Sequence, residues 1–198
     1  MVQVYVTEIP IHSRGAKEQS EWAHRLLYKA LERQYPEVCQ PVLLARAPKG
    51  KPFLLEYPGI HINLSHSGGY AACAIGERPV GIDVECWRNR RHRELVVKKF
   101  HLKEQKAYRA AEESQRGPLF HNLWVLKESF MKAEGSGLLI PLDTFYMEEI
   151  GKGMGRVIQH QNNKDYYYKL YSVRDKEFSL GVCSEEMDFC KEPTWILL

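Results

Sequence analysis

Three strand-like segments follow one another in the first half of the chain, and the connections between them are very short. They are residues 60–65, 70–75 and 80–85, with turn residues at 67–69 and 76–79. The first and third alternate apolar and polar residues, and the second is a small apolar run. Parallel pairing needs a crossover of about a dozen residues or more. These segments therefore predict an antiparallel sheet.

Helical patterns lie on both sides of this sheet region. Apolar residues recur at helical spacing in 16–35, before Pro36, and again in 94–113 and 119–133. Further strands are expected at 2–6, 41–47, 144–149, 166–173 and 177–183, with a loop at 47–52 and a hairpin connection at 151–155. Both halves thus combine helix with antiparallel sheet. We expect an α+β fold of two similar lobes, residues 1–79 and 80–198.

The composition of the 198-residue chain narrows the classes of function. Lys and Arg total 28 against 25 Asp and Glu, and this surplus is too small to indicate a nucleic-acid-binding protein. No apolar run approaches the roughly 20 residues that a membrane-spanning helix needs, and no signal-peptide pattern precedes the first strand. The five cysteines include no C-x-x-C pair, which predicts reduced thiols and a cytoplasmic protein.

Two acidic residues stand two positions apart in the predicted strand 80–85. Asp83 and Glu85 therefore project to the same side, while Ile82 and Val84 face the core. Neighbouring carboxylates repel, and either a cation or a raised pKa relieves that repulsion. Mg²⁺ prefers such oxygen ligands. The segment fits either a divalent-cation site or a solvated acidic strand face.

A second pattern lies in the predicted helix 119–133. Trp124, Glu128 and Lys132 are spaced at i, i+4 and i+8, so they form one stripe. A Glu–Lys pair on a helix surface contributes only about 0.2–0.5 kcal/mol, which is one interpretation. In the other, Glu128 supplies a third carboxylate to a metal site and Lys132 reaches an anionic group beside it.

Several polar residues could contact phosphate. Asn63 and Ser65 share the polar face of a strand, and His66 lies at the following turn. Serine and histidine at a loop mouth can donate to phosphate oxygens, although each can also be purely structural. Lys51, in a proline-containing loop, and Arg25, in the first helix, add cations. No residue arrangement supports a Ser-His-Asp triad.

In order and spacing, these strings resemble the 4′-phosphopantetheinyl transferase superfamily, of the surfactin-synthetase-activating type. The matching strings are residues 50–52 (GKP), 63–67 (NLSHS), 81–85 (GIDVE) and 124–132 (WVLKESFMK), with 140–145 continuing the pattern. The resemblance covers about residues 24–182. It implies a pseudo-dimer of two α+β lobes with the cofactor in the cleft between them.

The resemblance also implies a reaction. Such enzymes move the phosphopantetheine arm of coenzyme A onto a serine of an acyl or peptidyl carrier protein and release 3′,5′-ADP. Asp83, Glu85 and Glu128 are then expected to hold Mg²⁺, or alternatively Mn²⁺. Glu128 is also a candidate base, and Lys132 a catalytic cation. The residues expected to contact coenzyme A are Arg25, Lys51, Pro52, Ser65, His66 and Lys132.

Alternatives remain at this point. A non-catalytic module of the same fold could bind coenzyme A or a carrier protein, although three converging carboxylates have little use in a binder. The basic segment 87–93 is either a solvated face or a docking site for an acidic carrier protein. We expect neither a nucleic-acid partner nor a membrane. A monomer is expected, because duplication within one chain supplies the second lobe.

Overall fold

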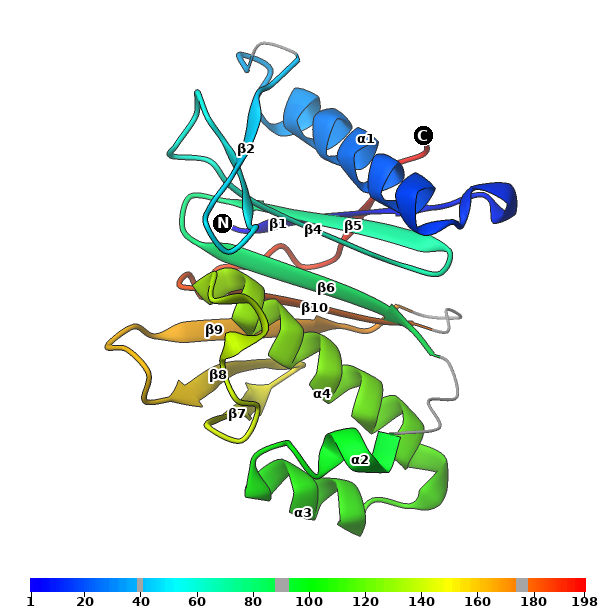
Figure 1. Ribbon diagram of the computed structural model, residues 1–198, viewed down its shortest axis with the longest axis vertical. Coiled ribbons are helices and arrows are strands. Elements are labelled where there is room, and N and C mark those ends of the chain that lie inside the picture. The colour runs from blue at the N-terminus through cyan, green and yellow to red at the C-terminus, as the bar shows by residue number, and fades with distance from the viewer. Residues whose placement is uncertain (39–40, 88–92, 174–177) are drawn as a thin grey trace.

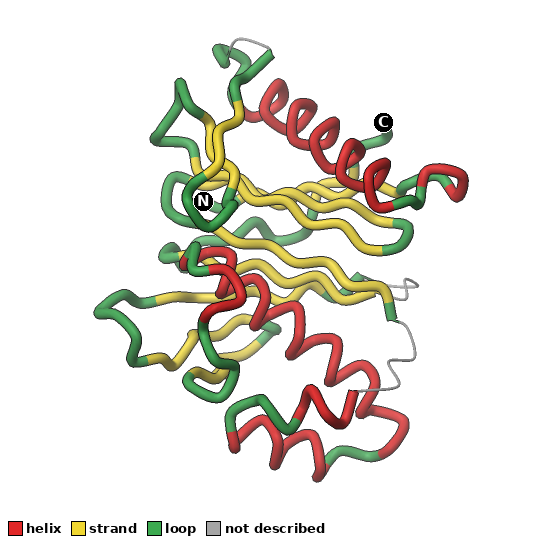
Figure 2. Tube along the Cα trace, viewed as in Figure 1, coloured by secondary structure: helices red, strands yellow, loops and turns green. Residues whose placement is uncertain are grey.

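A computed structural model describes residues 1–38, 41–87, 93–173 and 178–198 of the chain. Its elements form four layers, in which a mostly antiparallel sheet and a fully antiparallel sheet face each other and each carries a helix on its outer side (Figure 1). Figure 2 shows the long helices on opposite sides of the paired sheets. The predicted α+β class is confirmed, with one sheet and one long helix in each half.

The first sheet has the strand order β11-β1-β5-β4. Its strands are β1 (Gln3–Glu8), β4 (His61–Ser67), β5 (Tyr70–Gly76) and the short β11 (Thr194–Trp195). Helix α1 (Ala16–Gln34) covers the outer face, and its apolar stripe is buried there: Ala23, Leu26, Leu27, Ala30 and Leu31. A 3₁₀ turn (Ile11–Ser13) precedes α1, and β2 (Leu44–Arg46) pairs with β3 (Pro52–Leu54) beside this lobe. The predicted helix 16–35 is confirmed.

The second sheet has the order β6-β10-β9-β8-β7. Its strands are β6 (Val80–Cys86), β7 (Phe145–Gly151), β8 (Met154–Gln159), β9 (Tyr166–Tyr171) and β10 (Phe178–Ser184). Helix α4 (Glu113–Glu134) lies on its outer face and is followed by a 3₁₀ turn, Gly137–Leu139. The predicted hairpin at 151–155 is confirmed, because it joins β7 to β8.

The expectation of one helix over 94–113 is wrong. The chain instead forms α2 (Arg93–Val97) and α3 (Leu102–Ala110). Between them Phe100 is fully buried and stacks with Phe120 and Trp124. His101 then caps α3, because its Nδ1 accepts from Lys103 N at 3.2 Å. Burying Phe100 and starting a newly capped helix require the chain to turn here.

A common core joins the two sheets. Val4 and Val6 of β1, and Val2 just before it, pack across the interface against apolar residues of β6 and β10, among them Ile82 and Val182. The proposed boundary at 79/80 separates β5 from β6, the strands at which the chain changes sheets. The C-terminal β11 crosses that boundary and pairs parallel with β1. Within the described residues, no helix is long and apolar enough to span a membrane.

Candidate active site

The candidate site lies where the facing edge strands β4 and β6 meet. Here β4 presents side chains, not its backbone, to the backbone of β6. Each bond links residues 19 positions apart, so the strands run in the same direction in register. The acceptors are Asn63 Oδ1 for Ile82 N (2.9 Å), Ser65 Oγ for Val84 N (3.2 Å) and Ser67 Oγ for Cys86 N (3.2 Å). The amides of an edge strand are thus satisfied without a ladder.

The same serines also contact the two strand carboxylates. Ser65 Oγ donates to Asp83 Oδ1 at 2.7 Å, and Ser67 Oγ donates to Glu85 Oε2 at 3.3 Å. Asp83 is 7% exposed and Glu85 is half-buried. Ile82 and the next apolar residue of β6 enter the core between the sheets. The prediction that both carboxylates share one face is therefore confirmed.

Lys132 approaches these groups from α4. Its Nζ lies 2.7 Å from Asp83 Oδ1, 3.2 Å from Ser65 Oγ and 3.1 Å from the Ile82 carbonyl oxygen. The helix comes this close because residue 81 is glycine: a Cβ there would collide with the backbone of α4 at Ser129 and Ala133. Asp83 and Lys132, 49 positions apart in the chain, thus form the centre of the site.

Glu128 is half-buried, one helical turn before Lys132 on the same stripe of α4. The C-terminal part of α4 lies over Gly81, whereas Val125 lies over Gly181, the β10 partner of Asp83. The helix therefore runs against the direction of β6. This places Glu128 toward the Glu85 end of the strand.

A divalent cation fits the chemistry of these donors. The Lys132 ammonium already places positive charge against Asp83, and Asp83 and Glu85 are hard oxygen donors on one strand face. In the side-chain positions of the described residues, however, no three His, Cys, Asp or Glu side chains gather closely enough to hold a metal ion. The strand supplies two oriented carboxylates, and Glu128 lies on the helix that packs against this sheet.

A pocket of about 220 Å³ adjoins this centre. Its lining includes Lys51 and Pro52 from the first lobe and Lys132 and Gly135 from the end of α4. Gly135 ends the helix in the left-handed conformation (φ 82°), where glycine is favoured. A second pocket, of about 440 Å³, also contains Lys51, Pro52 and Gly135 in its wall. Predicted contact residues from both lobes therefore line one recessed surface.

Lys51 lines both pockets and is held in place by the end of α4. Its Nζ donates to the Ala133 carbonyl at 2.9 Å, at the C-terminal end of α4, where cations are favoured. Burial lowers the pKa of Lys51 to about 8, and Glu134 partly opposes that shift. An anion that binds beside this lysine stabilises its charged form.

The other predicted contact residues are placed differently. Ser65 is buried and its hydroxyl donates to Asp83, whereas His66 of β4 is exposed. Partial burial lowers the pKa of His66, and the positive charges of Lys132 and His24 add to the effect. Arg25 is exposed on α1 with its guanidinium 4.5 Å from the Trp22 ring centroid, and it lines neither pocket.

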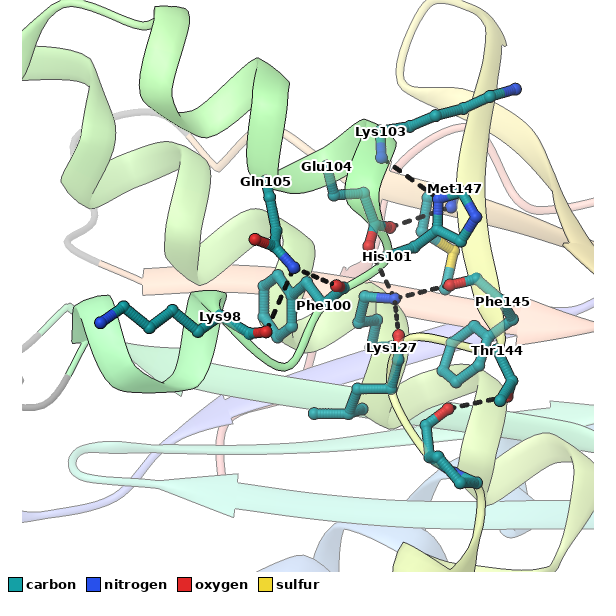
Figure 3. A network of polar contacts seen from close by, with 12 residues as sticks. Lys98, Phe100, His101, Lys103, Glu104, Gln105, Lys127, Thr144, Phe145 and Met147 are labelled. Carbon is teal, nitrogen blue, oxygen red and sulfur yellow. Dashed lines mark hydrogen bonds and ion pairs between the residues drawn. The ribbon is translucent and has the colours of Figure 1, made fainter.

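Lys127, beside Glu128 in sequence, has a different environment. It is fully buried and its Nζ lies 2.7 Å from Glu104 Oε2 and 2.9 Å from each of the carbonyls of Leu142 and Phe145 (Figure 3). Glu104 Oε1 accepts from Met147 N at 3.1 Å. This network ties α4 to α3 and to the start of β7. Lys127 therefore anchors the helix that carries Glu128 and Lys132.

Sequence reasoning missed two of these roles. It assigned Ser67 no function, although Ser67 has the same two-residue spacing from Ser65 as Glu85 has from Asp83. That matching alternation was an available signal. It also gave Lys127 no separate role, and no local pattern indicates that its partner is 23 residues away on another helix. Most of the basic segment 87–93 lies outside the described residues.

Residues 79–183 match the family model described as the 4′-phosphopantetheinyl transferase superfamily. The 4′-phosphopantetheinyl transferase Sfp of Bacillus subtilis is 31% identical over 183 residues, covering 89% of this chain and 80% of that protein. A second 4′-phosphopantetheinyl transferase of Bacillus subtilis is 33% identical over 141 residues, 71% of this chain and 62% of that protein. The solved holo-[acyl-carrier-protein] synthase of Thermotoga maritima is 19% identical, with a TM-score of 0.44 over 53% of this chain and 61% of that chain.

Proposed function

Since this chain belongs to the 4′-phosphopantetheinyl transferase superfamily, we propose that it transfers the phosphopantetheine arm of coenzyme A to a carrier protein. The acceptor is a serine hydroxyl of an acyl or peptidyl carrier. A bond forms between the serine oxygen and the phosphorus of the arm, the pyrophosphate bond breaks, and 3′,5′-ADP leaves. The observation that carries the proposal is the Asp83–Lys132 pair, at the meeting of the two sheets beside a pocket lined by both lobes.

The residues of the pocket match a polyanionic cosubstrate. Lys51 and Pro52 are proposed to contact the adenosine and 3′-phosphate end, and Lys132 the pyrophosphate. His66 on β4 can donate to a phosphate oxygen when a bound phosphate raises its pKa and it takes up a proton. Ser65 is proposed as a further contact, and Arg25 as a more distant cation on α1.

Mg²⁺, or alternatively Mn²⁺, is proposed to bind Asp83, Glu85 and Glu128. When bound, such a cation neutralises pyrophosphate charge as the bond to the leaving phosphate breaks. Lys132 supplies positive charge on the same side of the reacting group. Glu128, on the helix that packs against β6, is the candidate acceptor for the serine proton, either directly or through an oriented water.

We also propose a kind of carrier protein, a cellular compartment and an oligomeric state. Lysines at the pocket favour a carrier protein with an acidic surface, since complementary charge speeds encounter. The described cysteines 73, 86, 183 and 190 are free thiols, which supports a reducing cytoplasm. We propose a monomer, because the site already combines residues of two lobes.

The test is carrier modification followed by mass spectrometry. Purified protein, coenzyme A, Mg²⁺ and a panel of apo acyl and peptidyl carriers should yield a carrier heavier by one phosphopantetheine arm. Removing the metal with a chelator, or making Asp83→Ala, should abolish the product while circular dichroism stays native. Glu32→Gln, on the exposed side of α1, is the matched control and should leave the product intact. Failure to modify any carrier with any divalent ion contradicts the proposal, and leaves a non-catalytic binding module.

A further inference from the structure

The two serines of β4 form a repeated unit with β6. Each hydroxyl accepts the amide of one β6 residue and donates to the carboxylate of the residue before it. A hydroxyl has only one proton. Accepting the amide hydrogen therefore directs the hydroxyl proton toward the carboxylate. The backbone of β6 thus orients the donors that hold its own acidic side chains.

The third member of the series lacks a carboxylate. Asn63 accepts from Ile82 N at 2.9 Å, but the preceding β6 residue is Gly81, which has no side chain. Asn63 therefore contributes to the joining of β4 and β6 without contacting an acid. Joining the two strands and holding a carboxylate are therefore two distinct roles, and Asn63 has only the first.

Asp83 and Glu85 differ in how they are held. Asp83 has Lys132 at 2.7 Å in addition to Ser65. Glu85 has a longer side chain with more rotamers to restrict, and Ser67 Oγ, at 3.3 Å, links its Oε2 to β4. Groups that hydrogen-bond to a metal-binding carboxylate fix its orientation, and their loss weakens metal binding by about 10–100-fold.

We propose that Ser67 is a positioning residue that holds Glu85 in the orientation required to bind a divalent cation. This inference rests on the proposed function of the same site. It predicts that removing the Ser67 hydroxyl weakens Mg²⁺ binding while the join between β4 and β6 persists through Asn63 and Ser65.

The experiment measures Mg²⁺ affinity by isothermal titration calorimetry on the full chain with coenzyme A present, beside Mg²⁺-dependent carrier modification. Ser67→Ala should raise the dissociation constant for Mg²⁺ about tenfold and shift the Mg²⁺ dependence of modification equally. Ser67→Thr, which keeps the hydroxyl, should restore affinity to within about twofold of the parent. Ser67→Val, of the same shape as threonine but without the hydroxyl, should behave like alanine and covers the case in which alanine fails to fold.

Ser114→Ala, which removes an exposed hydroxyl in the first turn of α4, is the matched control. It should leave Mg²⁺ affinity within about twofold of the parent chain. Unchanged affinity in both Ser67→Ala and Ser67→Val, or an equal loss in Ser114→Ala, overturns the inference while leaving the transferase proposal intact. If the parent chain modifies no carrier and binds no Mg²⁺, the proposed function fails first and this inference fails with it.

Discussion

The Lys132 ammonium lies 2.7 Å from Asp83 Oδ1 and joins helix α4 to the strand at the boundary between the two sheets. The Asp83 side chain is 9% exposed and that of Lys132 is 28% exposed. Water therefore screens this pair less than it screens a pair on the protein surface. Each residue also contacts Ser65. Asp83 and Lys132 are therefore linked both directly and through the Ser65 hydroxyl.

Lys132→Met should destabilise the protein, because a largely buried carboxylate loses its cation. We expect the free energy of unfolding to fall by about 1–3 kcal/mol, measured by urea denaturation, and carrier modification to be lost. Lys29→Met is the control: the Lys29–Glu32 pair has a similar length, 2.8 Å, but is exposed, so its loss should cost less than about 1 kcal/mol. Equal losses in the two variants would contradict this account of the Asp83 site.

Gly81→Ala should disturb the site through the backbone. The added Cβ meets the Ser129 carbonyl oxygen and the Ala133 amide nitrogen, and neither can rotate away. We expect a loss of about 3 kcal/mol or more in unfolding free energy, with weaker coenzyme A binding as α4 moves. Gly59→Ala, where a Cβ meets nothing within 4 Å, should cost nothing. A native melting temperature for Gly81→Ala would show that the close approach is unnecessary.

Lys127→Met should be more damaging to stability than its distance from the pocket suggests. It leaves Glu104 without its cation and removes the Lys127 donor from the carbonyls of Leu142 and Phe145, which should cost about 3–5 kcal/mol. In the double variant with Glu104→Gln, the uncompensated charge disappears. The two changes should therefore cost less together than their sum, with a coupling of about 1–3 kcal/mol from a denaturation double-mutant cycle. Simple additivity would rule out the buried pair as the cause.

Coenzyme A binding should depend on pH through Lys51. Its pKa of about 8, below the usual 10.5 because of burial, means that it loses its charge as the pH rises from about 7 to 9. If its charged form binds the 3′-phosphate, the preference for coenzyme A over 3′-dephospho-coenzyme A should fall roughly tenfold by pH 9. Calorimetric titration of both ligands checks this. In Lys51→Met the preference should be smaller and independent of pH, and a pH-independent preference in the parent chain would contradict the assignment.

The lowered pKa of Lys51 also makes the stability of the folded protein depend on pH. The unfolded chain holds a proton on Lys51 up to about pH 10.5, whereas the folded chain releases it near 8. Between these values the unfolded state binds more protons, so this group makes the protein more stable as the pH rises. Below about pH 8 the burial of the charged group opposes folding. The stability of Lys51→Met should lack this contribution in urea titrations across the same range.

Local sequence patterns were enough to predict the strands and the acidic pair on β6. Alternation of apolar and polar residues and short turns are local properties, so they predict strands at 60–65, 70–75 and 80–85 and place Asp83 and Glu85 on one face. The expected antiparallel pairing holds for β4 with β5, but β6 lies in the other sheet and pairs with β10. The same periodicity failed at 94–113, where burial of Phe100 divides the segment. Apolar spacing reports which residues are buried, and does not show where the chain turns to bury them.

Which groups far apart in the chain come into contact depends on tertiary packing. Lys127 and Lys132 lie in one helical string, yet one closes a buried network with Glu104 and the other reaches Asp83. Ser65 and Ser67 acquire carboxylate partners because β4 and β6 run side by side in register. Such pairings depend on how helices and sheets pack, and packing sums many weak contacts between residues far apart in the chain. The spacing of residues along the chain therefore predicts which side chains share one face of a helix or strand. The packing of the two lobes determines which residues that face contacts.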